Sequence, residues 1–494
     1  MKILPKPQKS ENISGNFSIS DNSKIFCHSS VFVPQAERLA DLVYESTGNF
    51  LQFTDTLEEA QIIFSLDENC HSEGYMLMIS QGVATVICST AIGCFYAVET
   101  LRQVFNLDDK HQQITCANCY IEDYPRFTHR GLMVDISRHF FGVDTLKRIV
   151  ELMSRLKLNK LHLRLSDDQG FRIQIDKYPL LNQISSNRSG SEIIKDGQTV
   201  VDDTPCGGYL TKDDARTLVE YATKLGVEII PEISVPGRIA AVLAAHPEYS
   251  CTGQVSEVKK TWGASKDILC AGNDAAYDFV KDILDEICDI FPSQLIHLGA
   301  DKSPKDRWCN CKHCRERMAQ LKIDDYDELQ THLVEQFRVY LSAKGKTVVC
   351  YNDGLTKRAN SDIVAQVWTS HKHSVAKQIK CKRRVIISNR KHLELSVDKV
   401  SIGKILHLRP FKGIKKRNRD LVLGVEGAVF TQYIDTDDKL FVQLLPRLDA
   451  VAEVAWANGK KGFFKRVNRS LALYDKLNIA YDAKLLGRIG NTNK

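Results

Sequence analysis

The chain has 494 residues, of which 43% are hydrophobic and 26% charged, with a formal net charge of +6 at pH 7. This composition is that of a globular protein and excludes a disordered or fibrous one. The length exceeds one ordinary core but suits a large α/β barrel with a smaller domain, and the small charge excess does not indicate a dedicated nucleic-acid binder.

The N-terminal segment MKILPKPQKSENISG contains no apolar core of signal-peptide length, and two prolines interrupt it. No stretch of the chain approaches the run of about 20 apolar residues that spans a bilayer. We therefore expect a cytoplasmic protein with no membrane association, in which most of the fifteen cysteines are reduced.

Residues 1–125 predict a small N-terminal α/β domain. Strand-like runs occur at 61–66 (QIIFSL), 75–80 (YMLMIS) and 83–89 (VATVICS). A helix is expected to follow over 91–105, because its apolar residues recur at helical spacing. The stretch IEDYPRF at 121–127 then resembles a linker to the next unit.

From residue 126 to 494, short apolar runs alternate with longer amphipathic segments. GLMVDIS is followed by VDTLKRIVELMSRLK and NKLHLRLS, and the series ends with LVLGVEGAVF and a closing helix over 439–456. About eight such strand–helix units with nearly continuous apolar strands predict a (β/α)8 TIM barrel. A doubly wound open sheet is the alternative, and it is disfavoured because no glycine-rich phosphate loop follows the first strand.

Polar and aromatic side chains stand near the ends of the predicted strands, which converge on one pocket in a barrel. Such a combination suits a polyol, because aromatic faces stack on a sugar and carboxylates accept its hydroxyl protons. Any single residue could instead cap a helix or fill the core, so the prediction rests on the whole set. The candidates are Arg130, Asp167, Glu232, Arg238, Asp301, Lys302, Tyr351, Trp368, Glu394, Phe430 and Gln432.

Several segments carrying these residues resemble glycoside hydrolase family 20, the β-N-acetylhexosaminidases. The similar segments are RGLMVDISRHF (130–140), LRLSDDQGFRIQIDKYP (163–179), LIHLGADKSPKDRW (295–308) and LLPRLDAVAEVAW (444–456). Residues 1–125 resemble the family's N-terminal domain, so the resemblance covers nearly the whole chain. It implies a carbohydrate ligand and a substrate-assisted retaining mechanism, in which the 2-acetamido oxygen of an amino sugar attacks the anomeric carbon.

The resemblance also assigns roles to single residues. Asp301 matches the aspartate that orients the acetamido group, whereas the adjacent catalytic glutamate is replaced by Lys302. Arg130 is placed as the arginine that binds sugar hydroxyls, and Trp368 as a retained pocket tryptophan. The remaining matches are Asp167, which is retained, and the substituted positions Arg238, Tyr351, Glu394, Phe430 and Gln432.

The replacement of the catalytic glutamate by Lys302 leaves three functional hypotheses open. An ordinary lysine holds its proton too tightly to be a good acid near neutrality, although neighbouring cations such as Arg238 and Arg164 favour its neutral form. We expect an Asp301–Lys302 ion pair to prevail, in either an unusual glycosidase or a catalytically inactive sugar-binding pseudoenzyme. Because the changes add positive charge, an enzyme for an anionic sugar (sulfated, phosphorylated or uronic) is the third reading.

The remaining motifs predict no cofactor and no metal. Cys309, Cys311 and Cys314 are ligand types that suit Zn²⁺, but no second cysteine pair shares their spacing, which favours a loop with free thiols or one local disulfide. The basic stretch KGIKKRNR at 412–419 reads as a solvated surface, since no nucleic-acid motif accompanies it. We therefore expect no nucleic-acid partner.

Overall fold

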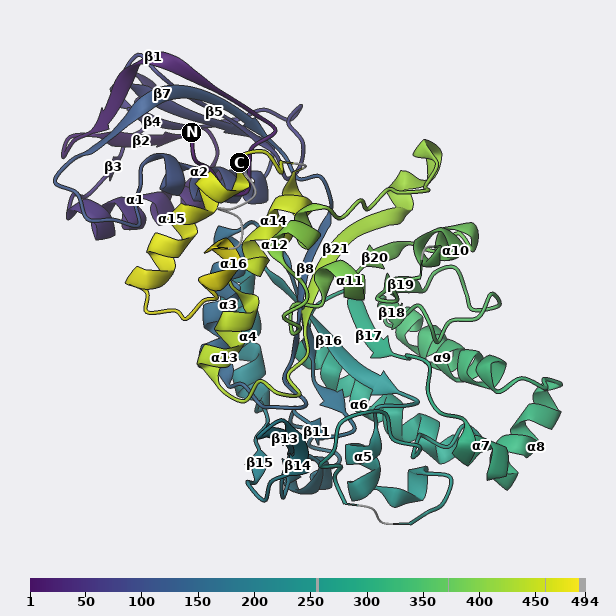
Figure 1. Ribbon diagram of the computed structural model, residues 1–494. Coiled ribbons are helices and arrows are strands. Elements are labelled where there is room, and N and C mark those ends of the chain that lie inside the picture. The colour runs from purple at the N-terminus through teal and green to yellow at the C-terminus, as the bar shows by residue number, and fades with distance from the viewer. Residues whose placement is uncertain (255–256, 372, 458, 488–494) are drawn as a thin grey trace.

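The computed structural model describes residues 1–254, 257–371, 373–457 and 459–487 (Figure 1). It contains a seven-stranded mixed sheet, formed by the N-terminal part of the chain, and a closed barrel of eight parallel strands. The predicted fold class, a (β/α)8 barrel preceded by a small α/β domain, is confirmed. The predicted boundary between residues 125 and 126 falls between the last strand of the sheet and the first strand of the barrel.

The N-terminal sheet has the strand order β1-β7-β5-β6-β4-β2-β3 and packs against two helices, α1 (Val33–Thr47) and α2 (Ala91–Val104) (Figure 1). In β5 and β6 every second side chain is buried, so one face of the sheet forms a core with both helices. The strands are β1 (Lys9–Ile19), β2 (Lys24–Cys27), β3 (Gln52–Phe53), β4 (Ile62–Leu66), β5 (Tyr75–Ser80), β6 (Val83–Cys88) and β7 (Ile114–Asp123).

The barrel strands follow one another in the order β16-β17-β18-β19-β20-β21-β8-β9, which closes the sheet on itself. All seven residues of β8 are buried, as expected for a strand covered on both faces. The strands are β8 (His129–Asp135), β9 (Lys160–Arg164), β16 (Glu228–Val235), β17 (Leu295–Gly299), β18 (Thr347–Tyr351), β19 (Val364–Val367), β20 (Val385–Ile387) and β21 (Val422–Val429).

Helices cover the outside of the barrel, and short strands decorate its loops (Figure 1). The helices are α3 (Val143–Arg155), α4 (Lys212–Lys224), α5 (Ala240–Ala245), α6 (Asp274–Ile290), α7 (Asp306–Asn310), α8 (Lys312–Leu321), α9 (Tyr326–Ala343), α10 (Ser374–Lys380), α11 (Arg390–Leu393), α12 (Ile402–Leu406), α13 (Asp437–Leu444), α14 (Arg447–Trp456), α15 (Phe463–Lys476) and α16 (Lys484–Gly487). The loop strands are β10 (Ser166–Asp167), β11 (Gly170–Phe171), β12 (Asn187–Arg188), β13 (Glu192–Lys195), β14 (Gln198–Val201) and β15 (Cys206–Gly207).

Two sequence-based expectations about elements were wrong. The single closing helix predicted over 439–456 is two helices, α13 and α14, because Pro446 lies between them and has no N–H to continue the first. The linker predicted over 121–127 begins inside β7, whose last three residues pair with β1 or β5.

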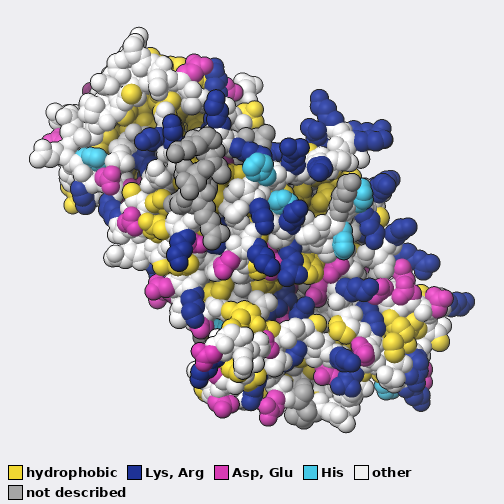
Figure 2. Space-filling model, in the orientation of Figure 1, with side chains coloured by type: hydrophobic (Ala, Val, Ile, Leu, Met, Phe, Trp, Pro, Cys, Tyr) yellow, Lys and Arg dark blue, Asp and Glu magenta, His cyan; other side chains and the backbone are white. Residues whose placement is uncertain are grey.

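Two further expectations concern the surface. Each helix that the structure describes is too short or too polar to span a bilayer. The basic side chains of the 412–419 loop are exposed, and Figure 2 shows Lys and Arg gathered on this projection before β21, at the upper right.

The two units are joined by buried cations at the N-terminal end of the barrel. Lys157, which is fully buried, donates to Asp123 Oδ2 (2.9 Å), and Trp456 Nε1 donates to the other oxygen of that carboxylate (2.8 Å). Arg130, also fully buried, donates to the Tyr96 hydroxyl (2.6 Å) and to the backbone oxygens of Phe127 and Lys157, and it pairs with Glu73 (2.7 Å). Both cations therefore tie the barrel to the N-terminal sheet and its helix α2.

Replacing Arg130 by Met should lower the free energy of unfolding by about 3–5 kcal/mol, because its buried partners lose their donor. Chemical denaturation measures this loss. The control is Lys160→Met, which removes the more exposed Lys160–Glu228 pair and should cost about 0–1 kcal/mol. Equal losses in the two variants would contradict a structural role specific to Arg130.

Candidate functional site

A cavity of about 190 Å³ opens at the C-terminal ends of the barrel strands. Its wall combines cationic, acidic, aromatic and amide side chains, the mixture that the sequence predicted for a polyol site. The lining residues are Arg138, Arg164, Arg238, Gly263, Asp301, Tyr351, Trp368, Arg390, Glu394, Phe430 and Gln432.

The strand ends bring most of the predicted site residues together at this cavity. Tyr351 is the last residue of β18, and Trp368 and Phe430 directly follow β19 and β21. The predicted residues that line the cavity are Arg238, Asp301, Tyr351, Trp368, Glu394, Phe430 and Gln432. Their roles toward a ligand stay predictions.

The placement of Arg130 corrects the sequence-based assignment. Arg130 is the second residue of β8, so it lies at the opposite end of the barrel, among the contacts to the N-terminal domain. The arginine that reaches the cavity from the same segment is Arg138, three residues after the end of β8. The sequence could have identified Arg138, because a residue at the start of a barrel strand lies at the N-terminal end of the barrel and a residue after the strand lies at the end that carries the cavity.

Asp167 lies behind the cavity wall and is fully buried. Its Oδ2 atom pairs with Arg138 Nη2 (2.8 Å) and Arg164 Nη2 (2.6 Å), and its Oδ1 atom lies 4.0 Å from Arg238 Nη1. Burial raises the pKa of this carboxyl, but Arg138 and Arg164 outweigh burial and lower its pKa to about 2. Asp167 therefore stays ionised, and as an anion it holds the arginines of the wall in place.

Asp301 is held at the cavity by Arg238. The Arg238 Nε–H donates to Asp301 Oδ2 over 3.0 Å, and the other oxygen, Oδ1, accepts no hydrogen bond from the residues that the structure describes. Arg238 has a φ of 57°, and Ala300, which precedes Asp301, has a φ of 50°. Both are left-handed backbone conformations that cost non-glycine residues energy, and such strain clusters at functional sites.

Lys302 does not pair with Asp301, which corrects the expected Asp301–Lys302 ion pair. Its side chain is 66% exposed, and its ammonium group lies 3.8 Å from Asp327 on α9. It is not among the residues that line the cavity. The backbone turn at Gly299 (φ 63°) and Ala300 delivers Asp301 to the cavity, while the next side chain lies outside it.

The arginines of the cavity are balanced by carboxylates, although the sequence suggested a positive pocket. Arg390 Nε donates to Glu394 Oε2 (2.6 Å), and Arg164 Nη1 donates to Glu232 Oε1 (2.6 Å). Arg138 Nη1 donates to Asp135 Oδ2 (2.6 Å), and Arg238 is held by Asp301. Each arginine therefore has a carboxylate partner, which removes the excess positive charge that would attract an anion.

A second charged network lies inside the barrel beneath the cavity. His162 Nδ1 lies 2.9 Å from Glu426 Oε1, and His162 Nε2 lies 2.9 Å from Glu232 Oε2. Burial lowers the pKa of His162, but Glu426 and Glu232 outweigh burial and raise its pKa to about 9. The ring of His297 stacks on His162 at 4.4 Å, and burial together with the His162 charge lowers the pKa of His297 to about 3. One histidine is thus charged at neutral pH and its neighbour is neutral.

The fold and the site define a (β/α)8-barrel protein with a sugar-sized, aromatic-lined cavity at the catalytic end of the barrel. Residues 127–459 match the model of the glycosyl hydrolase family 20 catalytic domain, and residues 1–124 match domain 2 of that family. The chain belongs to glycosyl hydrolase family 20.

Relatives and solved structures support this assignment. A beta-hexosaminidase of Porphyromonas gingivalis is 28% identical over the whole chain, which spans 66% of that protein's length, and one of Akkermansia muciniphila is 28% identical over 89% of the chain and 91% of that protein. The Streptomyces plicatus N-acetyl-beta-hexosaminidase, solved in complex with Thio-NAglucal, superposes with a TM-score of 0.82 at 26% identity, covering 97% of this chain and 96% of that one. The Vibrio harveyi GH20 exo beta-N-acetylglucosaminidase has the same fold, with a TM-score of 0.86 at 24% identity, covering 97% and 78%.

The charged His162 predicts how stability depends on pH. Its pKa is higher in the folded protein (about 9) than its ordinary value of 6.5, so its contribution is fully present below pH 6.5 and is lost as the pH rises to about 9. A shift of this size corresponds to about 3 kcal/mol. In His162→Gln, the free energy of unfolding, measured by denaturant titration, should therefore fall less between pH 6.5 and 9 than in the wild type.

The exposed His313 provides the control, and His313→Gln should keep the wild-type slope. Glu232, Glu426 and His297 face His162 from β16, β21 and β17, and all three remain in both variants. An unchanged pH slope in His162→Gln would show that another group carries the dependence.

Proposed function

We propose that this protein binds a terminal N-acetylhexosamine residue in the cavity and lacks the acid catalysis of its family. The observation that carries this proposal is the divergence of two neighbouring side chains: Asp301 lines the cavity, and Lys302 lies outside it beside Asp327. The cavity therefore keeps Asp301, the group that would recognise the sugar. The next position, which holds the proton donor in the family, places no acid in the cavity.

The geometry of Asp301 suits recognition of a 2-acetamido group. An amide N–H is a donor, and Asp301 Oδ1 is an acceptor without a competing hydrogen bond from the described residues. Tyr351, Trp368 and Phe430 offer ring faces for the apolar side of the sugar, and Gln432 and Glu394 offer polar atoms for its hydroxyls. That the Vibrio harveyi neighbour was solved in complex with N-acetylglucosamine supports this ligand class.

A neutral amino sugar is favoured over an anionic one. The arginines of the wall are already engaged by Asp135, Asp167, Glu232, Asp301 and Glu394, so a bound anion would have to displace a carboxylate. A buried cation that is already paired gains little from a second anion, which must itself lose its hydration.

Catalytic turnover on natural glycosides is expected to be weak for a physical reason. General acid help contributes roughly 10²–10⁴ in rate, and an alkoxide leaving group depends on it. A nitrophenyl leaving group needs no protonation. Hydrolysis of such a glycoside would need only the assistance that Asp301 gives to the attacking acetamido group.

We also propose a cytoplasmic location, on the sequence argument alone, which cell fractionation would test.

Isothermal titration calorimetry tests the binding site. N-acetylglucosamine should bind more tightly than glucose, and N-acetylglucosamine 6-sulfate should bind no more tightly than the neutral sugar. Asp301→Ala should weaken the binding of N-acetylglucosamine about 10- to 100-fold, the range for a lost hydrogen bond to a charged group. Lys302→Ala, at the adjacent position outside the cavity, should leave the affinity nearly unchanged. Equal weakening by both substitutions, or preference for the sulfated sugar, would overturn the proposal.

A second candidate function, hydrolysis with a different acid, is supported by Asp353. This carboxyl accepts a hydrogen bond from Trp368 Nε1 (2.9 Å), and burial, together with the nearby Asp301 charge, raises its pKa. A carboxyl that keeps its proton to higher pH beside a residue of the cavity wall is suited to donate a proton.

Hydrolysis assays separate the two functions. We expect slow turnover of a nitrophenyl N-acetylglucosaminide, lost in Asp301→Ala, and no turnover of the methyl glycoside. If the methyl glycoside is hydrolysed and Asp353→Asn abolishes this activity, the protein is a glycosidase with a relocated acid. If Asp353→Asn hydrolyses both substrates like the wild type, Asp353 is excluded as that acid.

A further inference from the structure

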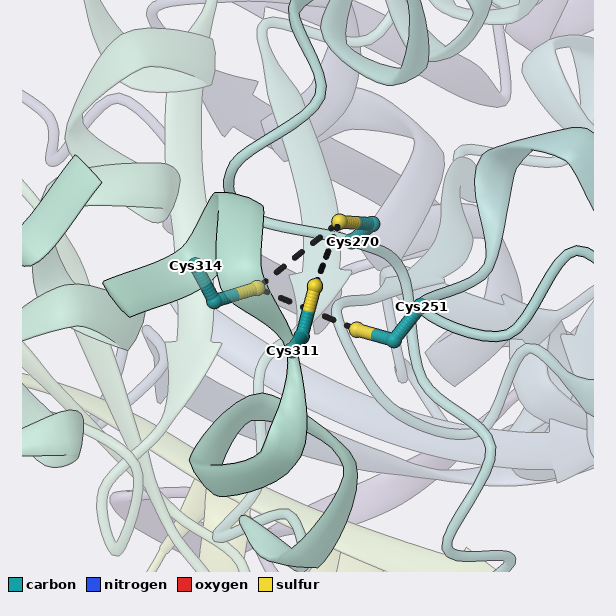
Figure 3. Close-up of side chains that lie close together, drawn as sticks. All are labelled: Cys251, Cys270, Cys311 and Cys314. Atoms are coloured by element: carbon teal, nitrogen blue, oxygen red, sulfur yellow. Dashed lines mark hydrogen bonds between the residues drawn. The ribbon is translucent and has the colours of Figure 1, made fainter. Parts of the chain in front are cut away.

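Four cysteine sulfurs that are scattered in the sequence meet beside the barrel (Figure 3). The Sγ atom of Cys314 lies 3.8 Å from that of Cys251 and 3.7 Å from that of Cys270, and the Sγ atoms of Cys270 and Cys311 are 3.8 Å apart. All four sulfurs lie within 4.8 Å of one another. We propose that Cys251, Cys270, Cys311 and Cys314 form a structural zinc site.

The separations match the coordination geometry of zinc. Zinc binds thiolates tetrahedrally at about 2.3 Å, which places neighbouring sulfurs about 3.8 Å apart. A disulfide requires a sulfur separation of about 2.05 Å. The three measured separations are far longer, and all four cysteines are free thiols. Four thiolates with no other donor select zinc or iron rather than magnesium or calcium.

The site is enclosed, as structural zinc sites are. Cys270, Cys311 and Cys314 are buried, and only Cys251 is partly exposed. Gly272 faces the first turn of α8 so closely that an added Cβ would lie 2.2 Å from the carbonyl carbon of His313. A glycine is therefore required for the Cys270 segment to approach the two cysteines on the other side.

The neighbouring candidate ligands are excluded by their positions. The side chain of His313, between Cys311 and Cys314, is 69% exposed and lies 3.8 Å from Glu316, away from the cluster. Cys309 is exposed and is not part of the four-sulfur group. The sequence argument against a metal was the absence of a second pair at matching spacing. The structure supplies that half of the site from two cysteines nineteen positions apart.

The cluster links the two loops that carry the Arg238–Asp301 pair. Cys251 and Cys270 lie in the connection from β16 to α6, which also carries Arg238. Cys311 directly precedes α8 and Cys314 lies in its first turn, shortly after Asp301 in the segment that follows β17. A metal bound by all four sulfurs would cross-link these two connections, and a link that closes long loops is expected to stabilise the fold by reducing the entropy of the unfolded chain.

The full-length chain, purified without a histidine tag in a thiol reductant and after zinc supplementation, should contain about one zinc per chain by mass spectrometry of the metal. Replacing zinc with Co²⁺ should give the intense visible bands and the thiolate charge-transfer absorption of tetrahedral sulfur coordination. The Cys251→Ser/Cys314→Ser double variant should lose both signals. Cys309→Ser, the exposed neighbour outside the cluster, should keep them.

Several outcomes would overturn the zinc site. These are a chain that stays metal-free after zinc supplementation, disulfides among the four cysteines in the native protein, or stoichiometric iron in place of zinc. The cobalt spectrum of the unaltered chain tests the site even if the double variant fails to fold. Loss of zinc in Cys309→Ser as well would place the metal elsewhere.

Discussion

The ion pair between Arg238 and Asp301 is the interaction on which the cavity depends. It joins the connections that follow β16 and β17, and it fixes the carboxylate that faces the cavity. The pair persists at a cost, since Arg238 and Ala300 both hold left-handed backbone conformations. The two loops also pack closely beside this pair, since a Cβ added at Gly237 would lie 2.3 Å from the Ser303 hydroxyl oxygen.

The buried carboxylates behind the cavity explain how so many arginines share one wall. Asp167 alone contacts Arg138 and Arg164 and lies within 4.0 Å of Arg238. An unpaired buried guanidinium would cost several kcal/mol, so each arginine at this position requires an anion nearby. The neighbouring Asp168 shows the opposite effect. Burial and the negative charge of Asp167 raise the pKa of Asp168 to about 6, because a second full negative charge beside Asp167 is disfavoured.

The two ends of the barrel serve different purposes, and similar residue types act differently at each. At the N-terminal end, Arg130 and Lys157 are buried in contacts with the N-terminal unit and with Trp456. At the C-terminal end, Arg138 and Arg238 line an open cavity, and the side chain of Arg238 is 20% exposed. The polarity of parallel strands imposes this division, since only the C-terminal ends carry the connections that can be shaped around a ligand.

The sequence by itself determined the barrel, the family and most of the cavity residues. Apolar periodicity identifies strands and helices locally, and residues such as Tyr351, Trp368 and Phe430 adjoin strand ends that must converge once the sheet closes. The family resemblance also predicts that Lys302 occupies the position of the acid, an assignment that stays a prediction. The predictions of the barrel and the family are confirmed because they depend on residues that are neighbours along the chain.

Only the tertiary structure decided which charges pair and which sulfurs meet. Asp301 pairs with Arg238 and not with the adjacent Lys302, because the turn at Gly299 and Ala300 points the two consecutive side chains in different directions. Arg130 was expected at the cavity, but Arg138 lies there instead, because the length of β8 separates the two ends of the barrel. The four cysteines came together from two connections for which spacing gives no signal, because their contact depends on how those connections fold over the barrel.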